Sequence, residues 1–319
     1  FFRGFSINFL ESIKKERKEE RKKGRKERWK KEGSFLAITI TMGIQKGGCG
    51  KSTTAGILSY LLSRDGYKVL AIDLDSQGNL TELLSNQPSN EFIGKSVLEA
   101  MQKQDVKKYI LPIEKNLDLL PATNFLATFP RWIYTGKTYK GDTIPFKGTP
   151  SLILDKSLDG IRNEYDFIII DTPPSLSEQT TNALCASEYV VVLFECSNWC
   201  YSAIPNFMES VTSAKNHGNR NTEVIGILRT LNDLRRSDAK AFNEMITEDY
   251  PDEVFKTVIT RRAPIGRLAL YGFNKNSELK QALLQYEEFY KELIKRVQSK
   301  RYKKYETSSE TDYSFPGSR

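Results

Sequence analysis

One glycine-rich run, Lys46-Gly-Gly-Cys-Gly-Lys-Ser-Thr53, contains the residue types needed to hold a phosphate chain. Its three glycines carry no side chains to obstruct backbone N–H groups that turn inward around an anion. A helix beginning near Lys51 would add the positive end of its dipole. In a loop of this kind the lysine bridges the β- and γ-phosphates, the Ser52 hydroxyl ligates Mg²⁺ and Thr53 donates to the α-phosphate. The run therefore predicts a site for ATP and Mg²⁺.

The spacing of this run departs from the common P-loop pattern, Gly-x4-Gly-Lys-Ser/Thr. Counting back from Gly50, the first glycine of that pattern falls at position 45, where this chain has Gln45, and a second lysine, Lys46, follows it. Gly43 and Gly47 are the nearest glycines on either side. Because an apolar run precedes the octapeptide and a helical pattern follows it, we still interpret it as a nucleotide loop. The residues expected to contact the nucleotide are Lys46, Gly47, Gly48, Cys49, Gly50, Lys51, Ser52 and Thr53.

Two aspartate motifs follow later apolar runs. Asp73-Leu-Asp75-Ser-Gln-Gly-Asn comes after the second run, and Phe167-Ile-Ile-Ile-Asp171-Thr-Pro-Pro ends another in the manner of a Walker B strand. A carboxylate in the first motif could orient an attacking water, and Asp171 could hold Mg²⁺ through water at the end of a buried strand. An apolar strand ending in aspartate is a weak signal alone. Three such motifs in this order predict a phosphate site.

The apolar runs also predict the fold that positions these motifs. Strands are expected at residues 36–44, 68–73, 116–120, 166–171, 189–194 and 223–228, with helices at 54–64, 177–187, 201–215 and 238–248. Continuous apolar strands are typical of a mostly parallel sheet covered on both faces, and strand–helix alternation gives a doubly wound α/β fold. Ligands in such folds bind beyond the carboxyl ends of the strands. The polar segments after Ile44, Asp73 and Asp171 lie at such ends.

The octapeptide resembles the deviant Walker A motif of the ParA/MinD ATPases, and the resemblance extends from about Ala37 to Val297. In that family the first lysine, here Lys46, reaches across a nucleotide-sandwich dimer to the partner's phosphates, as an arginine finger does. The resemblance makes Asp75 the residue that orients the attacking water and lets Asp73 support the magnesium shell. It thus implies catalytic roles for Lys46, Lys51 and Asp75, and metal binding by Ser52, Asp73 and Asp171.

The segment Val258-Ile-Thr-Arg-Arg262 resembles the Ile-Pro-Arg-Asn stretch that lies near adenine in this family. Thr260 stands where the family has proline, and Arg262 where it has asparagine. The resemblance implies adenine contacts by these two positions, although both differ from the family pattern.

Within the family, the chain looks most like plasmid and chromosome partition ATPases. Such proteins are cytoplasmic and nucleoid-associated. ATP closes a homodimer that binds DNA without sequence preference, and a ParB-type or small ribbon-helix-helix partner stimulates slow hydrolysis. Exposed arginines would contact DNA phosphates and make binding depend on salt. The candidates are Arg235, Arg236, Arg261, Arg262 and Arg267.

The net charge of +8 does not by itself locate a DNA-binding surface. Residues 1–35 hold 13 Lys and Arg against 6 Asp and Glu, so the remaining chain is nearly neutral. This charged segment is typical of disorder or a solvated helix, and it could also be a basic arm for nucleic acid. We further hypothesise that it is not native, with a natural start near Leu36. The expected organisation is an extension at 1–35, an ATPase domain at 36–299 with a surface insertion at 134–150, and a polar tail at 300–319.

Other function classes fit the sequence less well. No apolar run reaches the roughly 18 residues of a membrane span, and a MinD-like membrane ATPase would end in a basic amphipathic helix, whereas residues after Arg301 suggest a disordered tail. A reductase of the nitrogenase iron protein type needs cluster cysteines, for which Cys196 and Cys200 are poorly placed; the four cysteines indicate free thiols in a reducing compartment. A bacterial tyrosine kinase would match the tail tyrosines (Tyr302, Tyr305 and Tyr313) but not the Lys46 signature.

Overall fold

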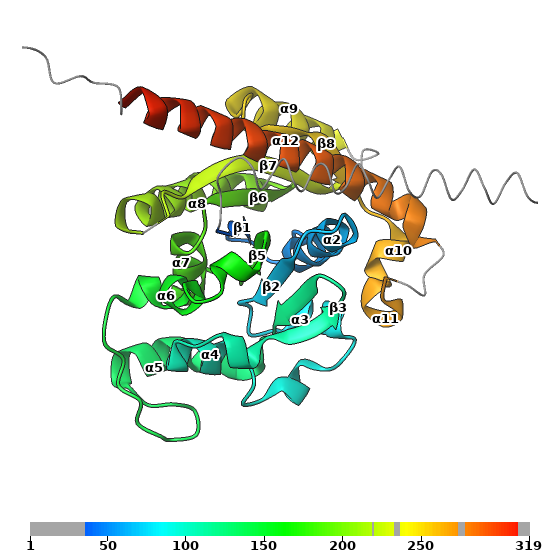
Figure 1. The fold of residues 1–319 in the computed structure, drawn as a ribbon. Coiled ribbons are helices and arrows are strands. Elements are labelled where there is room, and N and C mark those ends of the chain that lie inside the picture. The colour runs from blue at the N-terminus through cyan, green and yellow to red at the C-terminus, as the bar shows by residue number, and fades with distance from the viewer. Residues whose placement is uncertain (1–35, 219, 233–236, 274–277, 312–319) are drawn as a thin grey trace, which may run out of the picture.

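A computed structural model describes residues 36–218, 220–232, 237–273 and 278–311 of the chain (Figure 1). Its centre is an eight-stranded sheet in the order β3-β4-β2-β5-β1-β6-β7-β8. The strands are β1 (Ile38–Gly43), β2 (Val69–Asp73), β3 (Leu111–Glu114), β4 (Leu117–Leu120), β5 (Phe167–Asp171), β6 (Tyr189–Glu195), β7 (Glu223–Asn232) and β8 (Val254–Thr260). Only the pairing of β3 with β4 is antiparallel among these strands. The mostly parallel sheet predicted from the sequence is therefore confirmed.

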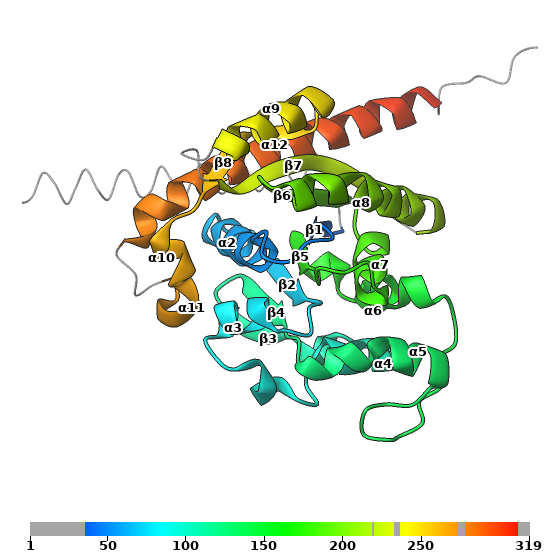
Figure 2. The ribbon, with the colours of Figure 1, turned by 180° about the vertical axis from the view of Figure 1, so that it is seen from behind.

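Helices connect the parallel strands. They are α2 (Lys51–Arg64), α3 (Asn79–Ser85), α4 (Val97–Lys103), α5 (Phe129–Thr135), α6 (Ile153–Leu158), α7 (Glu178–Cys185), α8 (Asn198–His217), α9 (Ser237–Asp249), α10 (Ala263–Gly266), α11 (Leu268–Tyr271) and α12 (Leu279–Thr311). Short 3₁₀ turns cover Ser89–Phe92, Lys107–Tyr109, Asn124–Thr128, Pro150–Leu152 and Arg162–Glu164. Figures 1 and 2 show helices on both sides of the sheet, as the doubly wound fold requires.

Two apolar clusters form the core on the two faces of the sheet. Because strand side chains alternate between faces, Val69 and Ala71 of β2 pack with residues of α2, whereas Leu70 and Ile72 pack with residues of α4, α5 and α6. The strands are thus buried on both sides. This burial explains why they read as continuous apolar runs in the sequence.

Two strands of the sheet were not predicted. β3 is a short, half-buried edge strand that contains Pro112, a residue confined to edges because it lacks a backbone donor. β8 lies at the opposite edge and carries the exposed Lys256 in its middle, so it does not show a continuous apolar run. Both edge strands therefore lack the continuous apolar run by which the central strands were predicted.

The last helix, α12, packs against the body of the protein. Its apolar stripe, which includes Leu283, Phe289 and Val297, is buried, and the helix contacts β8 and α2. The stripe therefore belongs to the core rather than to a membrane-surface helix. Among the described helices, none has the length and apolar character needed to cross a membrane.

The prediction of a disordered tail after Arg301 is wrong for its first part, because α12 continues to Thr311. Residues 301–311 contain neither glycine nor proline. Extending an already packed helix adds one hydrogen bond per residue fixed, without a new nucleation step. Polar composition therefore did not end the helix.

The segment 134–150 begins with the last two residues of α5 and continues as a mostly exposed connection, as expected of a surface insertion. Trp132 anchors it from beneath, since its indole N–H donates to the Ile144 carbonyl at 2.8 Å. Lys137 and Thr143 form an isolated antiparallel bridge within it. The connection is thus held to the body at its base.

Candidate nucleotide-binding site

The glycine-rich loop joins β1 to α2 at the carboxyl edge of the sheet. Gly48 and Gly50 have φ values of 77° and 78°, in the left-handed region where side chains bring strain. A Cβ atom at Gly48 would meet nothing within 4 Å, so the backbone borders open space. Helix α2 begins at Lys51, and no side chain caps its N-terminus. Its first N–H groups are thus available to an anion.

The two lysines of the loop have different environments. Lys51 is only 7% exposed, and among the described residues its one hydrogen bond runs from Nζ to the Lys46 carbonyl oxygen at 2.8 Å. Since an ammonium group carries three donors, two remain for phosphate oxygens. Lys46 is half-buried between Gln45 and Gly47, which are both exposed. Lys51 is therefore aligned along the loop, whereas Lys46 lies at its rim.

Asp171 has the environment of a magnesium-associated carboxylate. It is fully buried, and neither carboxylate oxygen has a hydrogen-bond partner among the described residues. Burial and the nearby Asp73 charge raise the pKa of Asp171 well above its ordinary value, while Ser52 and Lys51 act in the opposite direction. An unpartnered buried carboxylate is unfavourable unless a cation or hydrogen bond compensates it. Hard oxygen donors of this kind, next to a hydroxyl, fit Mg²⁺.

Strand register places the two aspartate motifs together. Asp73 of β2 pairs with Asp171 of β5, and Met42 of β1 also pairs with Asp171. The Thr172 hydroxyl donates to the Met42 carbonyl at 2.8 Å and ties the ends of β5 and β1. The loop and both motifs therefore share one edge, as the sequence predicted.

Asp73 is occupied by protein contacts. Its carboxylate accepts from the Asp75 N–H at 3.0 Å and from the Thr81 N–H and hydroxyl at 2.8 Å each. Burial raises its pKa to about 6, against the lowering effect of these bonds. Asp73 thereby fixes the turn that carries Asp75 and the start of α3. Its support of the magnesium shell stays a prediction.

Asp75 follows directly and is 8% exposed. Its Oδ1 accepts from the Gln77 N–H at 3.0 Å, a bond that closes the turn. The carboxylate is therefore held in a defined orientation at the edge that the loop shares. This arrangement suits a residue that orients water.

Asp171 gives a direct test of the metal assignment. Asp171→Asn is expected to weaken Mg²⁺ binding in the presence of ATP about 10- to 100-fold, the usual effect of losing a group that holds a metal through water. Without nucleotide the melting temperature should not fall, because the neutral amide replaces a carboxylate that lacks partners. Calorimetric Mg²⁺ titration and thermal unfolding would measure both. Asp166→Asn, just before the start of β5, is the matched control and should leave Mg²⁺ affinity unchanged; equal effects of the two variants would contradict the assignment.

Two residues at the end of β7 were missed by sequence reasoning. The Thr230 hydroxyl donates to the Cys49 carbonyl at 2.8 Å and anchors the loop to β7. Asn232 is 2% exposed, yet neither its amide nitrogen nor its oxygen has a partner among the described residues. The strand predicted from the sequence ended at residue 228. Polar residues that follow an apolar strand had indicated the site at Asp73 and Asp171, and the same signal could have indicated Thr230 and Asn232. Ending the strand four residues early hid these two.

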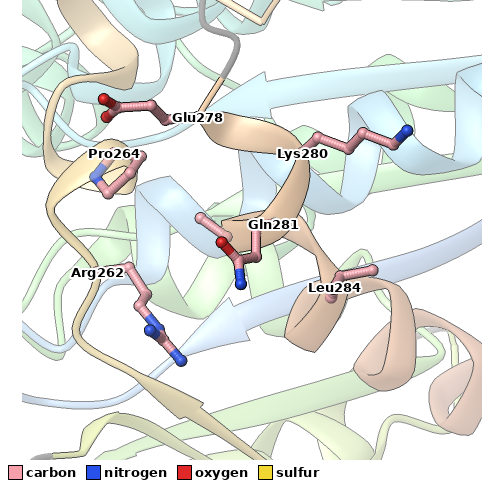
Figure 3. A pocket seen from close by; sticks show the side chains of 7 residues that line it. Arg262, Pro264, Glu278, Lys280, Gln281 and Leu284 are labelled. Carbon is pink, nitrogen blue, oxygen red and sulfur yellow. The ribbon is translucent and has the colours of Figure 1, made fainter.

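Thr260 and Arg262, the two positions predicted to contact adenine, lie at the end of β8 and just after it, next to β7 in the sheet. Thr260 pairs with Asn232 in the β7–β8 register, but its N–H and hydroxyl both donate to Gln285 Oε1 of α12, at 2.7 and 3.0 Å. Arg262 is exposed and lines a pocket of about 570 Å³ with Pro264 and residues at the start of α12 (Figure 3). Figure 3 shows the Arg262 and Gln281 side chains among those that line it.

The arginines proposed for DNA binding fall into three groups. Arg261 and Arg262 are exposed and have no ion-pair partner among the described residues. Arg267 is also exposed but pairs with Glu278 at 2.5 Å. Arg235 and Arg236 lie outside the described residues.

Comparison with known proteins agrees with this geometry. Residues 37–224 match a family described as an AAA domain. The chain is 31% identical over 244 residues to the sporulation initiation inhibitor protein Soj of Bacillus subtilis, covering 75% of this chain and 89% of that protein. It is 30% identical to the chromosome-partitioning ATPase Soj of Thermus thermophilus, over 73% of this chain and 85% of that protein.

Solved structures show the same fold. A plasmid partition protein from Borrelia burgdorferi bound to AMPPNP superposes with a TM-score of 0.62 at 25% identity, covering 83% of this chain and 99% of that one. Cobyrinic acid a,c-diamide synthase from Mycobacterium smegmatis, with an ATP analogue and magnesium, gives a TM-score of 0.69 at 24% identity, over 83% and 96% of the chains. The glycine-rich loop with Lys51, and the buried carboxylate of Asp171, therefore lie on a fold that these solved proteins share. The chain belongs to the ParA/Soj family of P-loop partition ATPases.

Proposed function

We propose that this ATPase is a dimer-forming switch that binds non-specific DNA in its ATP state and drives plasmid or chromosome segregation. A ParB-type or small ribbon-helix-helix partner stimulates its slow hydrolysis, and DNA binding makes it nucleoid-associated. The observation that carries this proposal is the second lysine of the loop. Lys51 keeps two donors for the phosphates of its own subunit, and Lys46, which lies between the exposed Gln45 and Gly47, would reach the phosphates of a second copy. A cation supplied across an interface stabilises charge that develops during phosphoryl transfer.

Within one subunit the nucleotide would extend from the loop toward β7. The phosphates lie on the loop N–H groups and Lys51, with Mg²⁺ at Ser52 and Asp171. Asn232 is the best candidate for the base, because its buried amide offers one donor and one acceptor without partners, as an adenine edge requires. Thr260 supports this end of the site through Gln285. Arg262, which follows β8, remains a candidate for a contact with the adenine base.

DNA binding is proposed at Arg261 and Arg262, which follow β8 at the carboxyl edge of the sheet. This edge also carries the nucleotide loop. Closure of two subunits around ATP would therefore bring two such arginine pairs into one surface. Arg267 should contribute less, because it must first exchange Glu278 for a DNA phosphate.

DNA retention tests the proposal. Wild-type protein should bind DNA of unrelated sequences with ATP and Mg²⁺ but not with ADP, and raising the salt should weaken binding. The double variant Arg261→Ala/Arg262→Ala is expected to lower the slope of log affinity against log salt by about 1 for each DNA phosphate that the protein no longer neutralises. Filter binding over a range of salt concentrations measures this slope.

Arg131→Ala is the matched control, since Arg131 is an exposed arginine of α5, which both views place far from α10. It should bind DNA like wild type. DNA binding that persists without nucleotide would point instead to the basic residues 1–35. An unchanged salt slope in the double variant would remove these arginines from the interface.

A further inference from the structure

Two cysteines from distant parts of the chain meet beside the nucleotide loop. Cys49 belongs to the loop and Cys200 to the first turn of α8, and their sulfur atoms lie 3.7 Å apart. Both side chains are fully buried, and both are free thiols. The bordering residues Gly47 and Gly48 are exposed. A small solute can therefore reach the loop backbone next to Cys49.

The geometry is close to that of a disulfide. A disulfide needs a sulfur–sulfur distance of about 2.05 Å, so the two atoms must approach by roughly 1.7 Å. Cys49 stands between Gly48 and Gly50, two glycines whose freedom of rotation lets the loop adapt. Its carbonyl, however, is held by Thr230. Closing the bond would therefore reshape the loop around this anchor.

The two thiols also differ in reactivity. The hydrogen bond with Cys200 and the charge of Lys51 hold the pKa of Cys49 below its ordinary value, against the effect of burial. The same bond and burial raise the pKa of Cys200. Since the thiolate is the nucleophile, Cys49 is the sulfur that reacts first.

We propose that Cys49 and Cys200 are an oxidisable pair, and that hydrogen peroxide converts them into a disulfide that disables the nucleotide loop. The Cys49 thiolate attacks one peroxide oxygen, giving a sulfenic acid and hydroxide. The Cys200 sulfur then attacks the Cys49 sulfur, forming the S–S bond and releasing water with its own proton. Overall, two thiols and one peroxide give one disulfide and two waters. The functional consequence rests on ATP binding at this loop.

The expected effect is large because the loop holds the phosphates. A displacement of about 1 Å at a reacting group lowers catalytic rates on the order of 100-fold. ATP hydrolysis should fall by at least that factor after oxidation and return with dithiothreitol. Bound ATP and Mg²⁺ should slow oxidation, because the nucleotide covers the exposed loop and fixes its shape.

Peroxide treatment of the full chain tests the proposal. After quenching and alkylation of the unfolded chain, only two of the four cysteines should carry the alkyl group, and the other two should have lost two hydrogen atoms to the disulfide. Trypsin and chymotrypsin together should then yield a peptide that links Cys49 to Cys200, since Trp199 separates Cys200 from Cys196. Binding of a fluorescent ATP analogue and ATP hydrolysis are measured before oxidation, after it and after reduction.

Cys200→Ser should hydrolyse ATP like wild type within about threefold and should form no disulfide with peroxide, since a lone Cys49 stops at the sulfenic acid and cannot form the bond. Cys185→Ser, a buried cysteine at the end of α7, is the matched control and should remain sensitive. The proposal would be overturned if no linked peptide formed, or if ATP binding were unchanged once the peptide had formed. It would also be overturned if peroxide lowered ATP hydrolysis in Cys200→Ser as much as in the wild type. If the reduced protein bound no ATP, the proposed nucleotide site would be refuted. The search for the linked peptide would still show whether Cys49 and Cys200 form a disulfide.

Discussion

Replacing Lys51 by alanine is expected to lower ATP hydrolysis by about 100- to 1,000-fold, the usual effect of removing one preorganised charged donor. Lys51 is buried in the loop, and two of its three donors are left for phosphate oxygens. The Lys46 carbonyl would lose its partner at the same time, so the loop should also lose its shape. Nucleotide binding should therefore become undetectable along with turnover. Equilibrium binding of a fluorescent ATP analogue and phosphate release measure the two effects.

Lys46→Ala is the matched control for this variant, because it removes the other lysine of the same loop. In the proposed dimer its ammonium group serves the phosphates of the partner subunit, and its backbone carbonyl, which accepts the hydrogen bond from Lys51, is kept in the variant. A single subunit should therefore still bind ATP within a few-fold of wild type, a difference of under about 1 kcal/mol. Should Lys51→Ala retain normal ATP affinity, the assignment of the loop would be wrong.

The second large effect is expected at Asp75. Asp75→Ala should hydrolyse ATP about 100- to 10,000-fold more slowly, the range for losing a group that orients or activates the nucleophile. ATP binding should persist, since Asp75 lies in a different loop from the phosphate-binding N–H groups. The result would be a protein held in its ATP state. Single-turnover hydrolysis and ATP binding separate the two steps.

Asp75→Asn distinguishes chemistry from loop structure. The asparagine oxygen can still accept the Gln77 N–H, so the turn is kept while the negative charge is lost. If the charge orients water, the asparagine variant should be nearly as slow as the alanine variant. Recovery of most activity in Asp75→Asn would show that Asp75 only supports the turn.

The sequence predicted the central strands and the phosphate end of the site because both depend on local patterns. Val69–Asp73 and Phe167–Asp171 are buried on both faces, and burial on both faces produces apolar runs that can be read directly. Their register then brings Asp73 and Asp171 together with little further information. The fold class and the positions of the motifs follow from these few elements.

The base end of the site could not be predicted in this way. The importance of Asn232 rests on its lacking a partner among the described residues of the folded chain, and no sequence pattern shows that lack. Thr260 suggested an adenine contact, but its hydroxyl and N–H are taken by Gln285 from 25 residues further along the chain. The contact between Cys49 and Cys200 likewise joins residues 151 positions apart. Such long-range contacts arise from packing, which a single sequence does not encode locally.

In the proposed mechanism, ATP closes two copies of this chain through Lys46, the second lysine of the loop. The most direct measurement is the molecular mass of Asp75→Ala in solution, by light scattering, with ATP and Mg²⁺, with ADP and without nucleotide. The mass is predicted to double with ATP only, and adding Lys46→Ala to this variant should return it to a monomer. A monomer with ATP, or a dimer that forms regardless of nucleotide or of Lys46, would contradict the claim.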